Sequence, residues 1–222
     1  MEFLVAFLML VIYVYIDNIN VKRHKMKNPN APGKGVGKTV EPIRKLKDIK
    51  AILQLLEKRP RDHLLFTIGI NNGLRTGDLL RLKVKDVKKQ LPGSSISIIE
   101  QKTKKKNVLM INKKVHQSLK TFFETVNPDD DDYLFASRKS GKPLTVPSVN
   151  RLIKSWTDSV NLTGRYGAHS LRKTWGYIQR MEFGTSFEVI CKRYLHASPV
   201  VTMRYLGIQD REVDEVLLHE IG

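Results

Sequence analysis

The chain has 222 residues with a hydrophobic content of 41%, which is enough for one globular domain with a sizeable core. Its 39 Lys and Arg residues outnumber 22 Asp and Glu residues, and the formal net charge of +17 favours a polyanionic partner, most commonly nucleic acid. Cys191 is the single cysteine, which excludes an intramolecular disulfide and a cysteine-rich metal site and fits a reducing cytoplasm.

An apolar N-terminal segment covers residues 1–16, and its run over residues 3–16 contains no charged residue. The run is shorter than the roughly 18–20 residues of a spanning helix, and it lacks the basic start and small-residue cleavage site of a secretory signal. A membrane anchor is therefore the minority interpretation, beside packing on the protein body or a partner and a marginal start of the reading frame. We expect a cytoplasmic protein associated with DNA.

Residues 17–44 form a basic segment with few large apolar residues, which indicates a linker or an arm that tracks DNA. The stretch P-G-K-G-V-G-K-T at 32–39 resembles a phosphate-binding P-loop. However, Pro32 occupies the position of the motif's first glycine, and no apolar strand precedes it. We therefore reject an NTPase.

Helical periodicity begins near residue 45, so we expect the main domain to cover residues 45–222. A first amphipathic helix should end near Arg59-Pro60. A second, well-buried helix over residues 63–71 should end at Gly73, since glycine favours the left-handed backbone that follows many helices.

The stretch G-L-R-T-G-D-L-L-R-L at 73–82 carries the first candidate site residue. Thr76 is expected to cap a helix whose apolar face consists of Leu79, Leu80 and Leu82. Arg75 then lies in the turn before this helix, where its long side chain can reach a ligand. Asp78 is expected either to orient the Arg75 guanidinium or to favour the helix N-terminus.

Residues 95–111 predict a β-hairpin, with S-I-S-I-I and V-L-M-I as strands and Q-K-T-K-K-K-N as the loop. Such lysine runs usually form a solvated surface. On a hairpin tip in a basic protein they are also well placed to contact a DNA groove or backbone. The lysines in question are Lys102, Lys104, Lys105 and Lys106.

Asp129 to Asp132 form the one acidic cluster before the C-terminal tail. Consecutive side chains diverge, and no His or Glu stands at ligand spacing, so a solvated loop is favoured over a metal site. The cluster follows a predicted helix over residues 113–126.

The last third of the chain predicts four more helical segments. Residues 147–160 form an amphipathic helix, and the next helix carries His169 and Arg172 and faces the core with Trp175, Ile178 and Met181. A short helix precedes His196, and Ser198-Pro199 then starts a helix that places Tyr205 about two turns along. The acidic, amphipathic tail over residues 209–222 should pack on protein rather than on DNA.

Two imidazoles, two guanidiniums and a phenol could converge on one anion. His169 and Arg172 are three residues apart and share a helix face. On a DNA phosphodiester, the arginines would bind phosphate oxygens, the imidazoles would exchange protons, and Tyr205 would attack as a nucleophile. Each residue alone has an ordinary structural explanation, and it is their joint occurrence that favours chemistry. No metal or cofactor is required.

These residues resemble the catalytic domain of the tyrosine recombinase (phage integrase) family in order and spacing. The matching pieces are Arg75 in its G-L-R-T-G-D context, Lys102, H-S-L-R at 169–172, L-H-A-S-P at 195–199, and Tyr205 nine residues after His196. The resemblance implies a mainly α (α+β) fold, helical with a small β-sheet or hairpin. It also implies site-specific recombination through a 3′-phosphotyrosyl intermediate and a free 5′-hydroxyl, without metal or ATP.

The same resemblance implies roles and partners. Lys102 would be the general acid and Tyr205 the nucleophile, while the phosphate would be surrounded by Arg75, His169, Arg172 and His196. The partners would be double-stranded DNA, accessory DNA-bending proteins and further copies of the chain, with the tail packing on a neighbouring protomer in a tetrameric synapse.

Two features depart from the family pattern. Family members usually carry a separate helical DNA-clamping domain, whereas only about 44 residues precede this catalytic domain. Leu195 stands where the family usually has Gly, so the backbone beside His196 is expected to be less free to adopt positive φ.

Three other functions compete with a recombinase. A truncated integrase could act only as a DNA-binding regulator, although the complete set of six residues argues against decay. A type IB topoisomerase would share the chemistry but relax DNA, and the acidic tail favours an assembling recombinase instead. A membrane-anchored nucleic-acid binder is favoured only by residues 3–16.

Overall fold

The computed structural model describes residues 39–208 and residue 218. The apolar segment 1–16, residues 17–38 of the basic segment 17–44 and the tail 209–222 apart from Leu218 lie outside the described residues, so their proposed boundaries remain predictions. The described residues from Val40 onward belong to one compact unit. None of the helices in residues 39–208 combines the length and apolar composition needed to cross a membrane.

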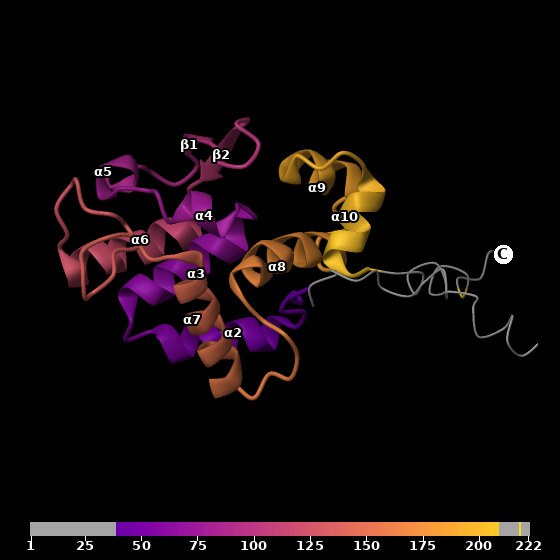
Figure 1. The fold of residues 1–222 in the computed structure, drawn as a ribbon, viewed down its shortest axis with the longest axis horizontal. Helices are drawn as coiled ribbons and strands as arrows, with labels where there is room; N and C mark the ends of the chain where they lie inside the picture. Colours follow the sequence, from indigo (N-terminus) through magenta and orange to yellow (C-terminus); the bar gives the residue numbers. More distant parts are fainter. Residues whose placement is uncertain (1–38, 209–217, 219–222) are drawn as a thin grey trace, which may run out of the picture. The chain divides into compact units, whose positions relative to one another are not determined.

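The described chain is mostly helical and contains one small sheet, as the sequence predicted (Figure 1). The helices are α2 (Leu46–Leu56), α3 (Pro60–Asn72), α4 (Thr76–Leu79), α5 (Val84–Val87), α6 (Lys113–Val126), α7 (Val146–Ser159), α8 (Ala168–Met181), α9 (Phe187–Tyr194) and α10 (Pro199–Leu206). The strands are β1 (Ser95–Ile99) and β2 (Lys106–Met110), which pair antiparallel with Ser95 opposite Met110.

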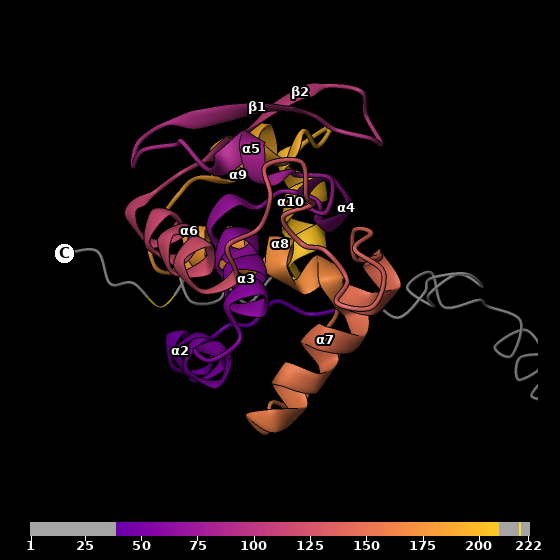
Figure 2. The same cartoon turned by 90° about the vertical axis from the view of Figure 1, so that its left-hand side faces the viewer.

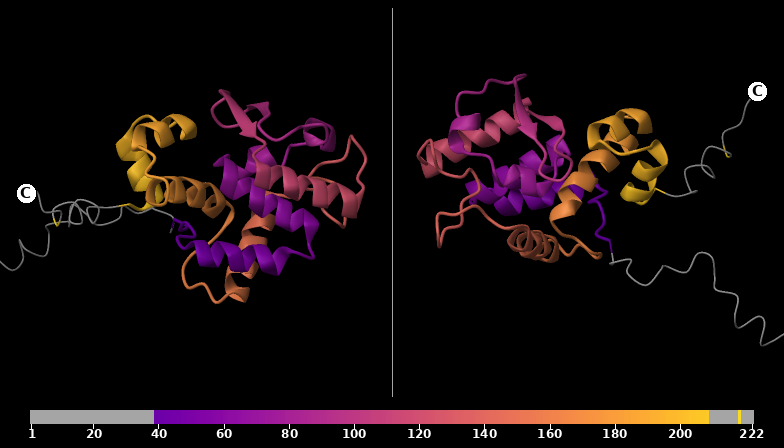
Figure 3. Two further views of the ribbon diagram at one scale, coloured as in Figure 1. Left: turned by 180° about the vertical axis from the view of Figure 1, so that it is seen from behind. Right: turned by 45° about the horizontal axis from the view of Figure 1, so that its top comes forward.

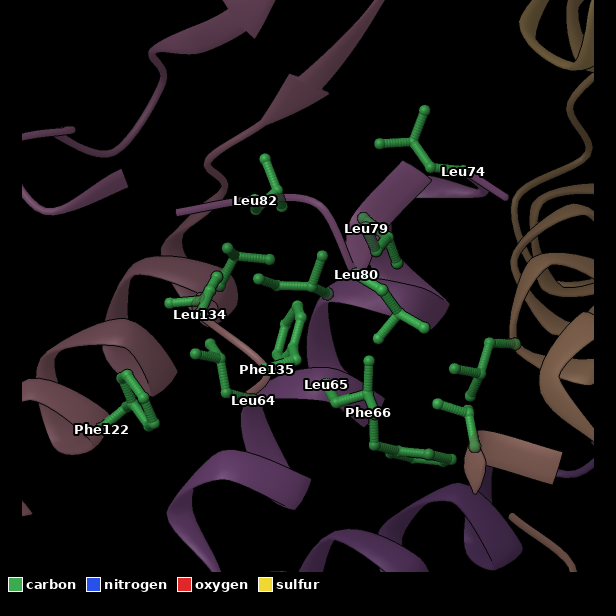
Figure 4. Packing of buried hydrophobic residues seen from close by; sticks show 14 of the residues in the cluster. Leu64, Leu65, Phe66, Leu74, Leu79, Leu80, Leu82, Phe122, Leu134 and Phe135 are labelled. Atoms are coloured by element: carbon green, nitrogen blue, oxygen red, sulfur yellow. The ribbon is translucent and has the colours of Figure 1, made fainter. Parts of the chain in front are cut away.

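Helix α3 forms the centre of the main core, because it packs against α2, α6 and α8. Leu64, Leu65 and Phe66 are fully buried and point into the cluster drawn in Figure 4. The α3–α8 crossing is close, since a Cβ at Gly69 would lie 2.6 Å from the Leu171 side chain. This approach brings the C-terminal end of α3 beside the first turns of α8.

Helix α4 is shorter than expected and is not capped by Thr76. Arg75 is the N-cap residue, without a side-chain capping bond, and Thr76 is the first helical residue. The Thr76 hydroxyl is buried and donates to the Ala168 carbonyl at 2.9 Å, so it joins α4 to the start of α8 instead. The helix ends at Leu79, and the chain turns so that Leu80 and Leu82 also enter the core.

The hairpin confirms the predicted strand–loop–strand order and is drawn as a long ribbon above α5 in Figure 2. Lys106 was expected in the loop at the hairpin tip, but it belongs to β2 and pairs with Ile99. The acidic cluster lies in an exposed loop, as predicted, where Asp131 contacts Lys85 at 2.7 Å and Asp130 contacts Lys88 at 2.7 Å.

A second, smaller core lies where α9 and α10 pack on α8 and on each other, at one end of α8 in Figures 1 and 3. Its buried residues are Ile190, Tyr194, Leu206 and Ile208. Met181, predicted to face the core, is 44% exposed, because burial declines along the last turn of α8.

Candidate active site

Arg75 leaves the extended turn before α4 and forms an ion pair with a buried carboxylate. Its Nη1 donates to Oε2 of Glu100, the residue that directly follows β1. Thr103 Oγ1 donates to the same oxygen at 2.7 Å, and Asn107 Nδ2 donates to Oε1 at 2.9 Å. Burial raises the pKa of Glu100, but these hydrogen bonds and the Arg75 charge outweigh it and hold the pKa below its usual value. Glu100 therefore stays ionised and fixes one arm of the guanidinium.

Asp78 does not make the contact with Arg75 that was one of its two expected roles. It lies in the first turn of α4, as the other expectation states, and its Oδ1 accepts from the Gln101 backbone N–H at 2.9 Å. Asp78 thereby anchors the start of the lysine loop, one residue before Lys102.

Arg172 lies on α8 and is 2% exposed, with both arms of its guanidinium held by backbone carbonyls. Nη1 donates to Gly73 O at 2.7 Å, at the end of α3, and Nη2 donates to Tyr194 O at 2.8 Å, at the end of α9. The guanidinium also lies 4.3 Å from the centre of the Tyr194 ring. Burial lowers the pKa of Arg172, but an arginine remains charged at pH 7.

His169, one turn before Arg172, is exposed at the start of α8. Partial desolvation lowers its pKa, and so do the positive charges of Arg172, Lys173, Arg75 and Lys102. The imidazole is therefore neutral at pH 7. Lys102 is exposed, and its charge contributes least to the lowering of the His169 pKa.

His196 follows α9 in the turn before α10. Its Nδ1 lies 3.0 Å from Thr202 Oγ1, which leaves Nε2 as the nitrogen not used by this contact. Burial lowers the pKa of His196 to about 4, with the charges of Arg172 and Arg75 acting in the same direction. Leu195 adopts φ +54°, so the positive φ that glycine favours is present here despite the larger side chain.

Tyr205 lies in the second turn of α10, and Ser198 caps this helix as predicted by accepting from Val201 N. The centre of the Tyr205 ring is 5.2 Å from that of the His196 ring and 5.5 Å from that of the Tyr194 ring. Lys173 Nζ lies 4.9 Å from the centre of the Tyr205 ring. The hydroxyl is buried and has no hydrogen-bond partner among the described residues. Burial raises the pKa of Tyr205, and the charges of Arg172 and Arg75 oppose the rise.

The structure thus brings Arg75, His169, Arg172, His196 and Tyr205 into one region, with Lys102 at its edge. Lys104, Lys105 and Lys106 are exposed on the hairpin. Sequence reasoning missed several residues in and beneath this site, namely Glu100, Asn107, Lys173, Arg193 and Thr202. Glu100 had one usable signal, since an acid that ends an apolar strand just before a lysine loop needs a cationic partner.

The chain belongs to the phage integrase family, which it matches over residues 45–212. It is 36% identical over 174 residues to the probable integrase/recombinase YoeC of Bacillus subtilis, a match that covers 77% of this chain and 91% of YoeC.

Solved structures of recombinases share the fold. The crystal structure of XerA recombinase has a TM-score of 0.67 at 21% identity, covering 82% of this chain and 68% of XerA. The site-specific recombinase XerH, bound to a palindromic difH substrate in a post-cleavage complex, has a TM-score of 0.65 at 21% identity. That match covers 85% of this chain and 55% of XerH, so the chain spans about half of that recombinase.

Proposed function

We propose that this chain is a site-specific DNA recombinase that cleaves and rejoins DNA through a 3′-phosphotyrosyl intermediate on Tyr205. One observation carries the proposal. The Tyr205 ring contacts His196, and its hydroxyl lies within the electrostatic range of Arg172 and Arg75, although these residues span 130 positions of the chain. Family membership and the relation to YoeC support the same function.

The two arginines would bind the scissile phosphate. Arg75 uses only Nη1 on Glu100, and its Nε and Nη2 have no hydrogen-bond partner among the described residues. Arg172 uses one hydrogen on each terminal nitrogen, which leaves further N–H groups for phosphate oxygens. Both guanidiniums would stabilise the charge that builds up on the non-bridging oxygens during attack.

Attack by Tyr205 requires removal of its proton, because burial raises the pKa of the phenol. His169 and His196 are neutral at pH 7, so either imidazole can accept that proton. The phenolic oxygen then bonds to phosphorus while the bond from phosphorus to the 5′-oxygen breaks. Lys102 would protonate this oxygen and release a free 5′-hydroxyl, and the reverse steps would join a new strand.

The substrate would be double-stranded DNA, and XerH provides the precedent of a recombinase bound to its DNA substrate. Lys104, Lys105 and Lys106 would contact the DNA backbone near the cleavage position. We further propose that the acidic tail over residues 209–222 packs on a neighbouring protomer in a tetrameric synapse. Accessory DNA-bending proteins would assist that assembly.

The test uses a nicked duplex carrying candidate sites, from which the short fragment with the freed 5′-hydroxyl diffuses away after cleavage. The full chain should form a covalent protein–DNA adduct, and Tyr205→Phe should form none, because phenylalanine has no nucleophilic oxygen. Binding without an adduct would support the DNA-binding regulator instead. Relaxation of supercoiled DNA without strand exchange between duplexes would support the topoisomerase. An adduct that persists in Tyr205→Phe would contradict the assignment of the nucleophile.

A further inference from the structure

We infer that Glu100 and Arg193 are positioning residues that join the two halves of the candidate active site through one chain of hydrogen bonds. The chain runs from Arg75 through Glu100 and Asn107 to Arg193. The inference rests on the proposed function, because the site that these residues position is the proposed cleavage site.

The candidate site is divided between two cores. The hairpin packs on the main core, which also includes Leu74, the residue before Arg75, whereas Tyr205 packs against the smaller core formed by α9 and α10. Helix α8 packs against both. Catalysis by groups from both cores requires their relative placement to within a fraction of an ångström, which demands side-chain links across the boundary.

Asn107 on β2 is the centre of the link. Its Nδ2 donates to Glu100 Oε1 at 2.9 Å, and its Oδ1 accepts from Arg193 Nη1 at 2.7 Å. The backbone N–H of Val108 donates to the same oxygen at 2.9 Å. Each end of the amide therefore faces a partner of the matching kind, an ionised carboxylate on one side and a guanidinium on the other.

Arg193 completes the link from α9, three residues before His196. Its Nε and Nη2 donate to Asn72 O at 2.9 and 2.6 Å, and Nη2 also donates to Val108 O at 2.9 Å. One planar guanidinium thus contacts the end of α3 and strand β2 together. A lysine could not do this, because its donors radiate from a single nitrogen atom.

Glu100 is fully buried, so it contacts neither DNA nor solvent in this arrangement. Glu100 would affect the chemistry by orienting the Arg75 guanidinium, so that its Nε and Nη2 groups point toward the phosphate. Arg193 would act through the α9–α10 turn that carries His196 and leads to Tyr205. If these four side chains form one unit, removing a hydrogen bond at either end should disturb the placement of the two halves of the site relative to each other.

A double-mutant cycle tests this unit. The variants are Glu100→Gln, Arg193→Met and their combination, and the measurement is the single-turnover rate of adduct formation on the nicked duplex at saturating DNA. We expect each single variant to lose about tenfold or more, and the double variant to be no slower than about twofold below the worse single variant. The DNA concentration giving half the maximal rate should change by less than about twofold, which a loss of DNA binding would not produce.

The protein contains a matched control pair at the other end of α3. Asp62 is 4% exposed and accepts from Arg61, whose Nη1 also donates to a backbone carbonyl, that of Ala136, at 2.8 Å. Asp62→Asn and Arg61→Met should reduce thermal stability while leaving the adduct rate per folded molecule unchanged. Should Arg193→Met fail to fold, Arg193→Lys replaces it in the cycle and is expected to lose most of the rate.

The outcomes separate this inference from the proposed function. The positioning role alone is overturned if the wild type forms the adduct and the two single variants lose no rate. It is also overturned if the rate losses of the two single variants multiply in the double variant. The same holds if the Arg61 and Asp62 variants slow cleavage as much as the Glu100 and Arg193 variants. Absence of an adduct with the wild type overturns the proposed function and the inference with it.

Discussion

Leu195 holds the turn between α9 and His196 in a conformation that costs an L-residue about 1 kcal/mol or more. Its φ of +54° and ψ of +37° are those of the glycine that usually ends a helix. The turn therefore adopts a backbone conformation that glycine favours, with a leucine in that place. The half-buried leucine side chain offsets part of the strain by its packing.

Replacing Leu195 by Gly and by Ala separates strain from packing. Both variants remove most of the leucine side chain, but only Ala retains the strain. We expect Leu195→Gly to be more stable than Leu195→Ala by about 1 kcal/mol in urea unfolding, the reverse of the order at an ordinary helix position. Equal stabilities, or a more stable Ala variant, would show that the left-handed turn is not strained.

His196 gives the protein a specific sensitivity to acid. The folded imidazole has a pKa of about 4, whereas an unfolded histidine titrates near 6.5. Between these values the unfolded state binds the proton and the folded state does not, so stability falls as pH decreases from about 6.5 to 4. Partial exposure of the ring reduces the size of the effect.

His196→Gln should remove this part of the acid sensitivity. The measurement is the free energy of unfolding in urea at pH 7 and pH 5 for both proteins. We expect the wild type to lose more stability than His196→Gln between these pH values, with His169 contributing a similar loss in both. A wild-type loss equal to that of the variant would contradict a depressed pKa at His196.

At the scale of elements, α8 and α9 approach each other through Gly176. A Cβ at this position would collide with the Tyr194 hydroxyl and would lie 3.0 Å from Leu206, and both residues are buried. The Tyr194 hydroxyl also donates to the Arg172 carbonyl, so it has little room to move. The missing side chain thus lets α9 and α10 sit close enough for Tyr205 to reach Arg172.

Gly176→Ala should therefore destabilise the protein, although Gly→Ala inside a helix normally stabilises by up to about 1 kcal/mol. We expect a loss of about 1–3 kcal/mol from overpacking, measured by thermal or urea unfolding. Gly77→Ala in α4 is the matched control, because the nearest atom to its added Cβ is 3.6 Å away and ordinary contact results. A neutral Gly176→Ala would show that α9 can move away without cost.

Local patterns predicted most elements but not the links between them. Apolar spacing and cap residues indicated α3, α6, the hairpin and the position of Tyr205 in α10, since each signal lies within about ten residues. The pairing of Arg75 with Glu100 joins positions 25 apart, and that of Arg193 with Asn107 joins positions 86 apart. No periodicity encodes such pairs, and the one-turn length of α4 likewise depends on tertiary contacts of its leucines.

At the scale of the whole molecule, the excess of Lys and Arg over Asp and Glu should determine how binding to DNA responds to salt. Each lysine that neutralises a phosphate releases condensed counterions, so the logarithm of affinity falls with the logarithm of salt concentration in proportion to the number of phosphates neutralised. The lysines paired with Asp130 and Asp131 are partly compensated. The hairpin lysines Lys104 and Lys105 are exposed and make no ion pair among the described residues.

Replacing Lys104 and Lys105 together by Gln should lower the steepness of this dependence by about 1.8, or about 0.9 for each phosphate that is no longer neutralised. Affinity for duplex DNA would be measured by fluorescence anisotropy at several salt concentrations. Lys154→Gln provides the control, because Lys154 is paired with Asp158 at 2.8 Å on α7, away from the hairpin in Figures 1 and 2. If the double variant keeps the wild-type salt dependence, the hairpin tip does not touch the DNA backbone, and the protein must hold its substrate through other cations.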